Sequence, residues 1–157
     1  MPKLFVCFST VVVTGALCAC LAGQDDSRPD LSGKWQLDAS KSEMQLNRLS
    51  ALTMVISEKD GNITINEDEK LADGKERKIA YACTTDGKEC DVSGAKSKAS
   101  FWYNGPMLVS METQRNGGNV TRQRLKLSPD SKELMVEISS LVPQSEKIDK
   151  LVLERQP

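Results

Sequence analysis

The chain contains no histidine, and this limits the chemistry that it could carry out. Histidine is the commonest general base and metal ligand, and it is the usual partner of a catalytic serine or cysteine. The spacing of the remaining residues assembles neither a nucleophile–base pair nor a set of metal ligands. We therefore predict that the protein is not an enzyme and that it needs no metal or cofactor.

Cys83 and Cys90 have a spacing that predicts a covalent link. They bracket Asp86-Gly87, and Asp-Gly is a strong signal for a two-residue hairpin turn with positive φ at both positions. Such a turn places the two cysteines directly opposite each other, within disulfide range, and an oxidising compartment would close the bridge. A redox-active or metal-binding pair is the alternative, but the spacing is not Cys-x-x-Cys and no further thiol or imidazole completes a site.

Two charged segments are candidates for binding. Glu67-Asp68-Glu69-Lys70 is interpreted as a solvated loop, because calcium would need more converging oxygens than its spacing provides. Arg122 and Arg124 share a face and could bind a carboxylate if that face pointed inward. Leu125 and Leu127 occupy the core side of the same run, so we expect both arginines to face solvent.

Residues 1–23 have the layout of a secretory signal peptide. A single Lys3 precedes an uncharged, mostly apolar run that ends in small residues. A retained membrane anchor is the alternative, because the run is nearly long enough to span a bilayer. Residues 24–31 are polar, and we expect a flexible lead-in there.

The end of this leader leaves two outcomes open. Leu17-Cys18-Ala19-Cys20 resembles the lipobox of bacterial lipoproteins, which implies lipidation of Cys20 and an outer-membrane anchor. Ordinary cleavage nearby would instead release a periplasmic or secreted protein. The formal net charge of -1 gives no reason to expect nucleic acid as a partner.

The rest of the chain reads as short alternating runs separated by turn residues. Nine or ten such runs recur at intervals of roughly ten residues, which is typical of an all-β sandwich or barrel. Because the joints are tight, we predict an antiparallel up-and-down β-barrel of about 8–10 strands whose closure removes exposed edges. One short helix is expected between Asp38 and Ser50, where Ser40 and Glu43 have the spacing of a capping box.

Gly33-x-Trp35, at the start of the first run, resembles the Gly-x-Trp signature of the lipocalin and calycin barrels. The resemblance implies that Arg155, on the last run, packs across Trp35 in a cation–π contact. Phe101-Trp102-Tyr103-Asn104-Gly105, together with neighbouring short motifs, is similar to uncharacterised exported bacterial proteins with lipocalin-like domains. Residues 32–157 are therefore expected to form a lipocalin-like barrel.

A barrel of this size implies binding of an apolar or amphiphilic small molecule in its interior. The candidates for ligand contact are Tyr81, Phe101, Trp102 and Met111. The alternative is a structural or interaction module of the bacterial cell envelope whose barrel is filled by its own side chains.

Overall fold

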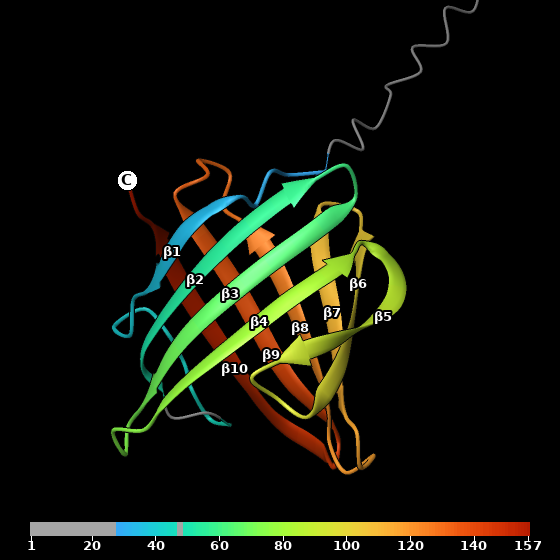
Figure 1. Cartoon of the computed structure of the whole chain (residues 1–157). Coiled ribbons are helices and arrows are strands. Elements are labelled where there is room, and N and C mark those ends of the chain that lie inside the picture. Colours follow the sequence, from blue (N-terminus) through green and yellow to red (C-terminus); the bar gives the residue numbers. More distant parts are fainter. Residues whose placement is uncertain (1–27, 47–48) are drawn as a thin grey trace, which may run out of the picture.

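The computed structural model describes residues 28–46 and 49–157, and within these it contains ten strands and no helix (Figure 1). The strands are β1 (Gly33–Leu37), β2 (Leu49–Lys59), β3 (Asn62–Leu71), β4 (Glu76–Thr84), β5 (Asp86–Ser93), β6 (Ser97–Asn104), β7 (Met107–Gln114), β8 (Val120–Leu127), β9 (Glu133–Val142) and β10 (Gln144–Arg155). The predicted signal peptide, including Cys20, lies outside the described residues.

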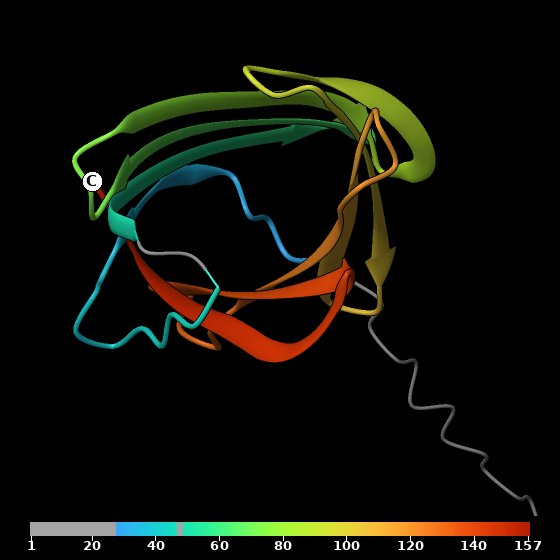
Figure 2. The ribbon, with the colours of Figure 1, turned by 90° about the horizontal axis from the view of Figure 1, so that it is seen from below.

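Each strand pairs antiparallel with its neighbours in sequence, and β1 also pairs with β10, so that the sheet closes into a barrel. The view along the barrel shows this ring of strands (Figure 2). The predicted up-and-down barrel is confirmed. Within residues 28–46 and 49–157, no helix has the length and hydropathy that a membrane span would need.

The β2–β3 hairpin shows how the sequence pattern produces the sheet. Asp60 and Gly61 both have positive φ, 52° and 75°, as a two-residue turn between twisted strands requires. On either side of the turn, alternate side chains such as Ile56 and Ile63 are buried while Ser57 and Thr64 are exposed. Period-two alternation therefore sets which face of the strands packs inside.

The contact between β1 and β10, which we call the seam, closes the barrel. Trp35 lies opposite Arg155 in the ladder, and Leu37 lies opposite Leu153. The Trp35 side chain is fully buried, and its Nε1 donates a hydrogen bond of 3.0 Å to the Leu31 carbonyl oxygen. This satisfies the one polar atom of the indole inside the core.

Arg155 covers the Trp35 ring, with its guanidinium carbon 4.2 Å from the ring centroid. Its Nη1 donates to the Ser32 carbonyl oxygen at 2.8 Å, and its Nε donates to the Ser131 carbonyl oxygen at 2.9 Å. The cation–π contact expected from the family resemblance is thus present. Because Ser131 belongs to the β8–β9 turn, this contact marks the end of the barrel that carries that turn.

The expected helix between residues 38 and 50 is not formed in the described part of that segment, residues 38–46. The Ser40 hydroxyl and main-chain N–H both donate backward to Asp38 Oδ1, at 2.5 and 2.9 Å, so they do not cap a following helical turn. Glu43 instead forms an isolated antiparallel bridge with Lys150 of β10. Pairing with the sheet satisfies main-chain groups that a short helix would otherwise have bonded internally.

The structure describes residues 28–31 of the expected lead-in. Leu31 is fully buried in the core, and the Arg28 guanidinium carbon lies 5.0 Å from the centroid of the Tyr103 ring. Residues 28–31 therefore pack against the barrel, because an apolar side chain and a cation–π contact hold them there.

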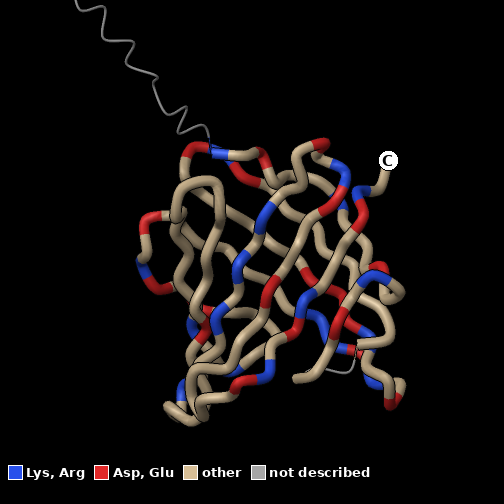
Figure 3. The backbone as a smooth tube through the Cα atoms, turned by 180° about the vertical axis from the view of Figure 1, so that it is seen from behind, with Lys and Arg blue, Asp and Glu red and all other residues tan. Residues whose placement is uncertain are grey.

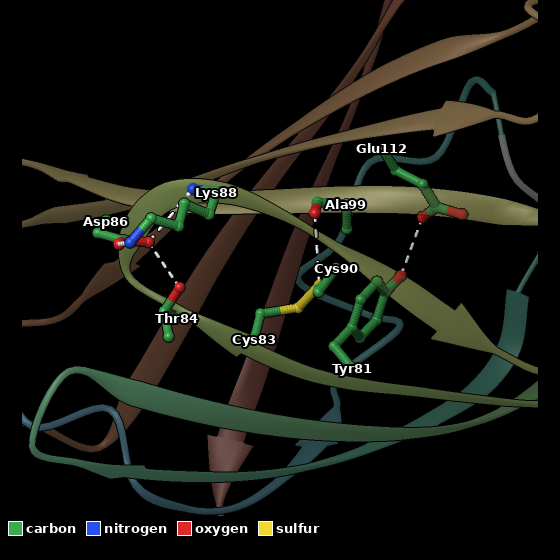
Figure 4. Close-up of a disulfide and its surroundings, with 8 residues drawn as sticks. All are labelled: Tyr81, Cys83, Thr84, Asp86, Lys88, Cys90, Ala99 and Glu112. Carbon is green, nitrogen blue, oxygen red and sulfur yellow. Dashed lines mark hydrogen bonds and ion pairs between the residues drawn. A yellow bond between two sulfur atoms is a disulfide. The ribbon is translucent and has the colours of Figure 1, made fainter.

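Cys83 and Cys90 form the predicted disulfide, with their Cα atoms 5.5 Å apart (Figure 4). Their turn differs from the predicted one, because Gly87 has a positive φ of 82° whereas Asp86 does not. The Asp86 carboxylate accepts hydrogen bonds from the Thr84 hydroxyl at 2.5 Å and from the Lys88 main-chain N–H at 3.2 Å. A side-chain-stabilised turn thus replaces the two-residue hairpin turn.

Candidate functional site

The interior of the barrel changes from apolar to polar along its length. At the Trp35 end it is filled by large buried side chains that form one cluster: Trp35, Phe101, Leu108, Leu125, Leu134 and Leu153. The other end carries the β7–β8 and β9–β10 turns (Figure 1). There the inward positions hold carboxyl, hydroxyl and amide groups, and a cavity of about 500 Å³ lies among them.

Two residues of the charged run Glu67–Lys70, Glu67 and Glu69, line this cavity, and the prediction of a solvated loop was wrong. Strand β3 continues through it to Leu71 and pairs with both β2 and β4. Alternation places Glu67 and Glu69 on the same inward face as Ile65, while Asp68 and Lys70 are exposed. The inward pattern of β3 therefore changes from isoleucine to glutamate without a change in secondary structure.

The polar side chains that line the cavity include Glu67 and Glu69 from β3, Arg77 and Tyr81 from β4, Glu112 from β7 and Gln123 from β8. Ile79 and Ile138 add apolar surface beside them. The cavity therefore offers hydrogen-bonding and charged groups together with hydrocarbon, which suits a ligand that has both kinds of surface.

Two of the three glutamates have partners on other strands. Glu112 accepts hydrogen bonds from the Tyr81 hydroxyl at 3.0 Å (Figure 4) and from the Ser97 hydroxyl. Glu69 forms an ion pair with Arg77, with 2.5 Å between Oε2 and Nη2. These contacts fix the positions of both carboxylates. The positive charge of Arg77 is paired with the negative charge of Glu69.

Glu67 is different, because its carboxyl has no hydrogen-bond or ion-pair partner in residues 28–46 and 49–157. Its side chain is 5% exposed and faces the cavity. Burial raises the pKa of this carboxyl to about 8, and the negative charges of Glu69 and Glu112 add to the rise while Arg77 opposes it. At neutral pH, Glu67 is therefore largely protonated.

Tyr81 connects the cavity to the core. Burial raises the pKa of its hydroxyl, and the charges of Glu67 and Glu112 raise it further, so the group remains a hydrogen-bond donor. Its ring packs edge-on against Phe101, with 5.5 Å between the centroids. This contact holds the hydroxyl in place toward Glu112.

Asp149 on β10 holds the segment before β2 against the cavity end of the barrel through hydrogen bonds. Its side chain is fully buried, and its Oδ1 accepts hydrogen bonds from the main-chain N–H groups of Gln45 and Leu46, at 2.5 and 2.6 Å. Leu46 in turn lines the cavity. The non-helical segment ending at residue 46 thus forms part of the cavity wall.

Of the four ligand-contact candidates named from the sequence, only Tyr81 lines the cavity. Phe101 packs behind it in the core. Trp102 and Met111 lie on the outer face, because each is next in sequence to an inward residue, Phe101 in one case and Glu112 in the other. The alternation that made Phe101 an inward residue therefore excludes the other two from the interior.

Arg122 and Arg124 lie on the outer face of β8, as expected from Leu125. Arg124 forms an ion pair of 2.8 Å with Glu137 there, and both side chains are partly exposed. The inward neighbour is Gln123, which lines the cavity. On the side seen in Figure 3, basic and acidic residues are interspersed along the strands rather than separated by sign.

Sequence reasoning missed Glu67, Glu69, Glu112 and Gln123 as cavity residues. The period-two alternation along β3 could have identified the two glutamates of that strand. It continues without a break from Ile63 and Ile65 to Glu67 and Glu69, so all four side chains point inward. Within residues 28–46 and 49–157, no three His, Cys, Asp or Glu side chains are grouped closely enough to hold a metal ion.

Comparison with known proteins identifies the architecture and no more. No family model matches the chain, and no curated protein does. Among solved structures, a point mutant of the fluorescent protein UnaG is similar with a TM-score of 0.56 and 16% sequence identity, over 80% of this chain and 95% of that one. Residues 28–46 and 49–157 thus form a ten-stranded closed antiparallel barrel, and at this identity the likeness to UnaG extends to the fold alone.

Proposed function

We propose that the protein is an exported, non-catalytic barrel of the bacterial cell envelope that binds a small amphiphilic molecule in the polar half of its interior. The observation that carries this proposal is the cavity of about 500 Å³. Its volume lies within the roughly 300–1,000 Å³ of ordinary ligand sites. Large unfilled spaces among the inward side chains of a barrel are uncommon, because close packing is the more stable arrangement.

An amphiphilic ligand fits better than a purely apolar one. The apolar half of the interior is filled by Trp35, Phe101 and their neighbours, which are fully or almost fully buried. The remaining space adjoins Glu67 and Glu112 as well as Ile138. A wholly apolar ligand would remove water from the carboxyl groups without replacing its hydrogen bonds, which is costly.

Export is supported by the signal-peptide layout of residues 1–23 and by the disulfide between Cys83 and Cys90, since disulfides persist in oxidising compartments. Lipidation of Cys20 and simple cleavage give mature proteins of different mass. Intact-mass measurement of the mature protein therefore distinguishes an outer-membrane anchor from release into the periplasm or medium.

The test of binding is native mass spectrometry of the protein purified from its own host. A bound small molecule is expected, and it should be lost in Ala95→Leu, which places a larger side chain at the cavity wall. Ala82→Leu makes the same change at an exposed position and should retain the ligand. A mass equal to that of the bare chain, in both wild type and control, would favour the alternative of an envelope module without a ligand.

A further inference from the structure

The charges around the cavity are unbalanced. Three carboxyl groups, those of Glu67, Glu69 and Glu112, face it, and Arg77 is the one basic side chain among its described lining residues. Arg77 is already paired with Glu69, and Glu112 is hydrogen-bonded by two hydroxyl groups. The unmet requirement of the cavity is therefore a positive charge or a strong hydrogen-bond donor beside Glu67.

An unpartnered carboxyl group that is almost fully buried is costly to keep. It must either hold its proton or find a cation, because the desolvated charge is strongly unfavourable. Leucine or methionine at this position would extend the inward row of Ile63 and Ile65 without that cost. The carboxyl of Glu67 faces open space where a ligand atom could reach it, so its missing partner is expected in the ligand.

We propose that the ligand carries a protonated amine or a similar organic cation, and that the Glu67 carboxylate binds this group inside the barrel. This inference rests on the proposed function, because it names the chemical class of the molecule in the same cavity. The Glu112 carboxylate adds negative potential beside the cation. Ile79 and Ile138 contact the hydrocarbon part of the ligand. An anionic ligand such as a fatty acid would instead meet like charge.

The groups that face Glu67 determine how binding depends on pH. They are Glu69 on its own strand, Arg77 and Tyr81 on β4, and Glu112 on β7. With a pKa of about 8 in the free protein, Glu67 must release its proton before it can pair with a cation. The affinity for an alkylamine, which like lysine keeps its charge up to about pH 10, should therefore increase with pH.

The experiment is calorimetric titration of the purified protein with three probes of equal chain length: octylamine, octanol and octanoate. Octylamine is expected to bind most tightly. Its affinity should rise by up to about 50-fold between pH 6 and pH 8, as one carboxyl of pKa near 8 becomes ionised. Glu67→Gln keeps the shape of the side chain but should lose at least about tenfold in octylamine affinity at pH 8, together with the pH dependence.

Asp68→Asn is the matched control. It removes one carboxylate from the residue next to Glu67. The Asp68 side chain is exposed on the outer face, and its Oδ1 lies 3.3 Å from the Lys78 Nζ atom. Octylamine binding should be unchanged in this variant. An equal loss in Asp68→Asn and Glu67→Gln would show that net charge alone attracts the amine, and it would overturn the inference.

The remaining outcomes separate the two proposals. If octanol or octanoate binds as tightly as octylamine, the protein is a binder of amphiphiles but the cationic preference is wrong. If none of the three binds and the protein from its host also carries no small molecule, the proposed function itself fails and the inference fails with it.

Discussion

The sharpest prediction concerns the stability of the ligand-free protein as a function of pH. Glu67 has a pKa of about 8 in the folded protein against an ordinary value of 4.5, so the folded state binds this proton more tightly than the unfolded state does. Between these two values the unfolded chain loses the proton while the folded protein keeps it. The free energy of unfolding should therefore fall as pH rises from about 4.5 to about 8.

The size of the effect follows from the shift. Each unit of pKa difference corresponds to about 1.4 kcal/mol, so the loss between pH 5 and pH 8 is about 3.5 kcal/mol. Well below pH 4.5 and well above pH 8 this residue adds no slope, because folded and unfolded states then have the same protonation. In Glu67→Gln the side chain cannot ionise, and this contribution should vanish.

The chain is well suited to the measurement because it has no histidine. No ordinary side chain titrates between pH 5 and pH 8, so a slope there can be assigned to a perturbed group. Urea unfolding of wild type, Glu67→Gln and Asp68→Asn, followed by tryptophan fluorescence at pH 5, 6, 7 and 8, gives the free energies directly.

We expect wild type and Asp68→Asn to lose stability together while Glu67→Gln stays level by comparison. Parallel profiles for wild type and Glu67→Gln would refute the reasoning. They would mean that water or a rearranged partner solvates the carboxylate, and that its pKa is close to the ordinary value.

Three further predictions concern the scaffold. Arg155→Ala should lower stability by about 1–2 kcal/mol, because a cation–π contact and two hydrogen bonds are lost, and it should shift the fluorescence of Trp35; an unchanged melting temperature and spectrum would speak against the contact. Reduction of the Cys83–Cys90 disulfide should cost about 2–3 kcal/mol for so short a loop, measured by thermal unfolding with and without reductant, and no change in midpoint would contradict this. Gly94→Ala should destabilise the protein far more than Gly74→Ala in the same assay. Both glycines have positive φ, but an added Cβ overlaps the main-chain oxygen of Lys78 only at Gly94. Equal losses of stability would show that the cost comes from backbone strain and not from this overlap.

The scaffold could be predicted because its signals are local. The Asp60-Gly61 turn, the alternation of Ile63 and Ile65, and the tight joints between strands each specify a neighbour in sequence. The pairing of Trp35 with Arg155 is the exception, since nothing local joins residues so far apart, and the family resemblance supplied it.

The site could not be predicted in the same way, because the polar character of a residue does not indicate whether its side chain faces the barrel interior or the solvent. An isoleucine on a strand indicates the inward face, whereas a glutamate such as Glu67 suggests solvent even when it continues the inward row. The opposite error occurred with Trp102, an aromatic residue placed on the outer face by its neighbour Phe101. In both cases the register of the strand overrides the chemistry of the side chain.

The seam between the first and last strands also affects how the barrel folds. Nine of the ten strand pairs of the described chain join consecutive strands and can form as local hairpins, whereas β1 meets β10 only after almost the whole domain has been ordered. Because long loops close at greater entropic cost, this pairing is expected late in folding. Until it forms, β1 and β10 each have an unpaired edge that can bind another chain. A chain held open at the seam would therefore be the species most prone to aggregation, and the Arg155 contacts protect against it by keeping the ring closed.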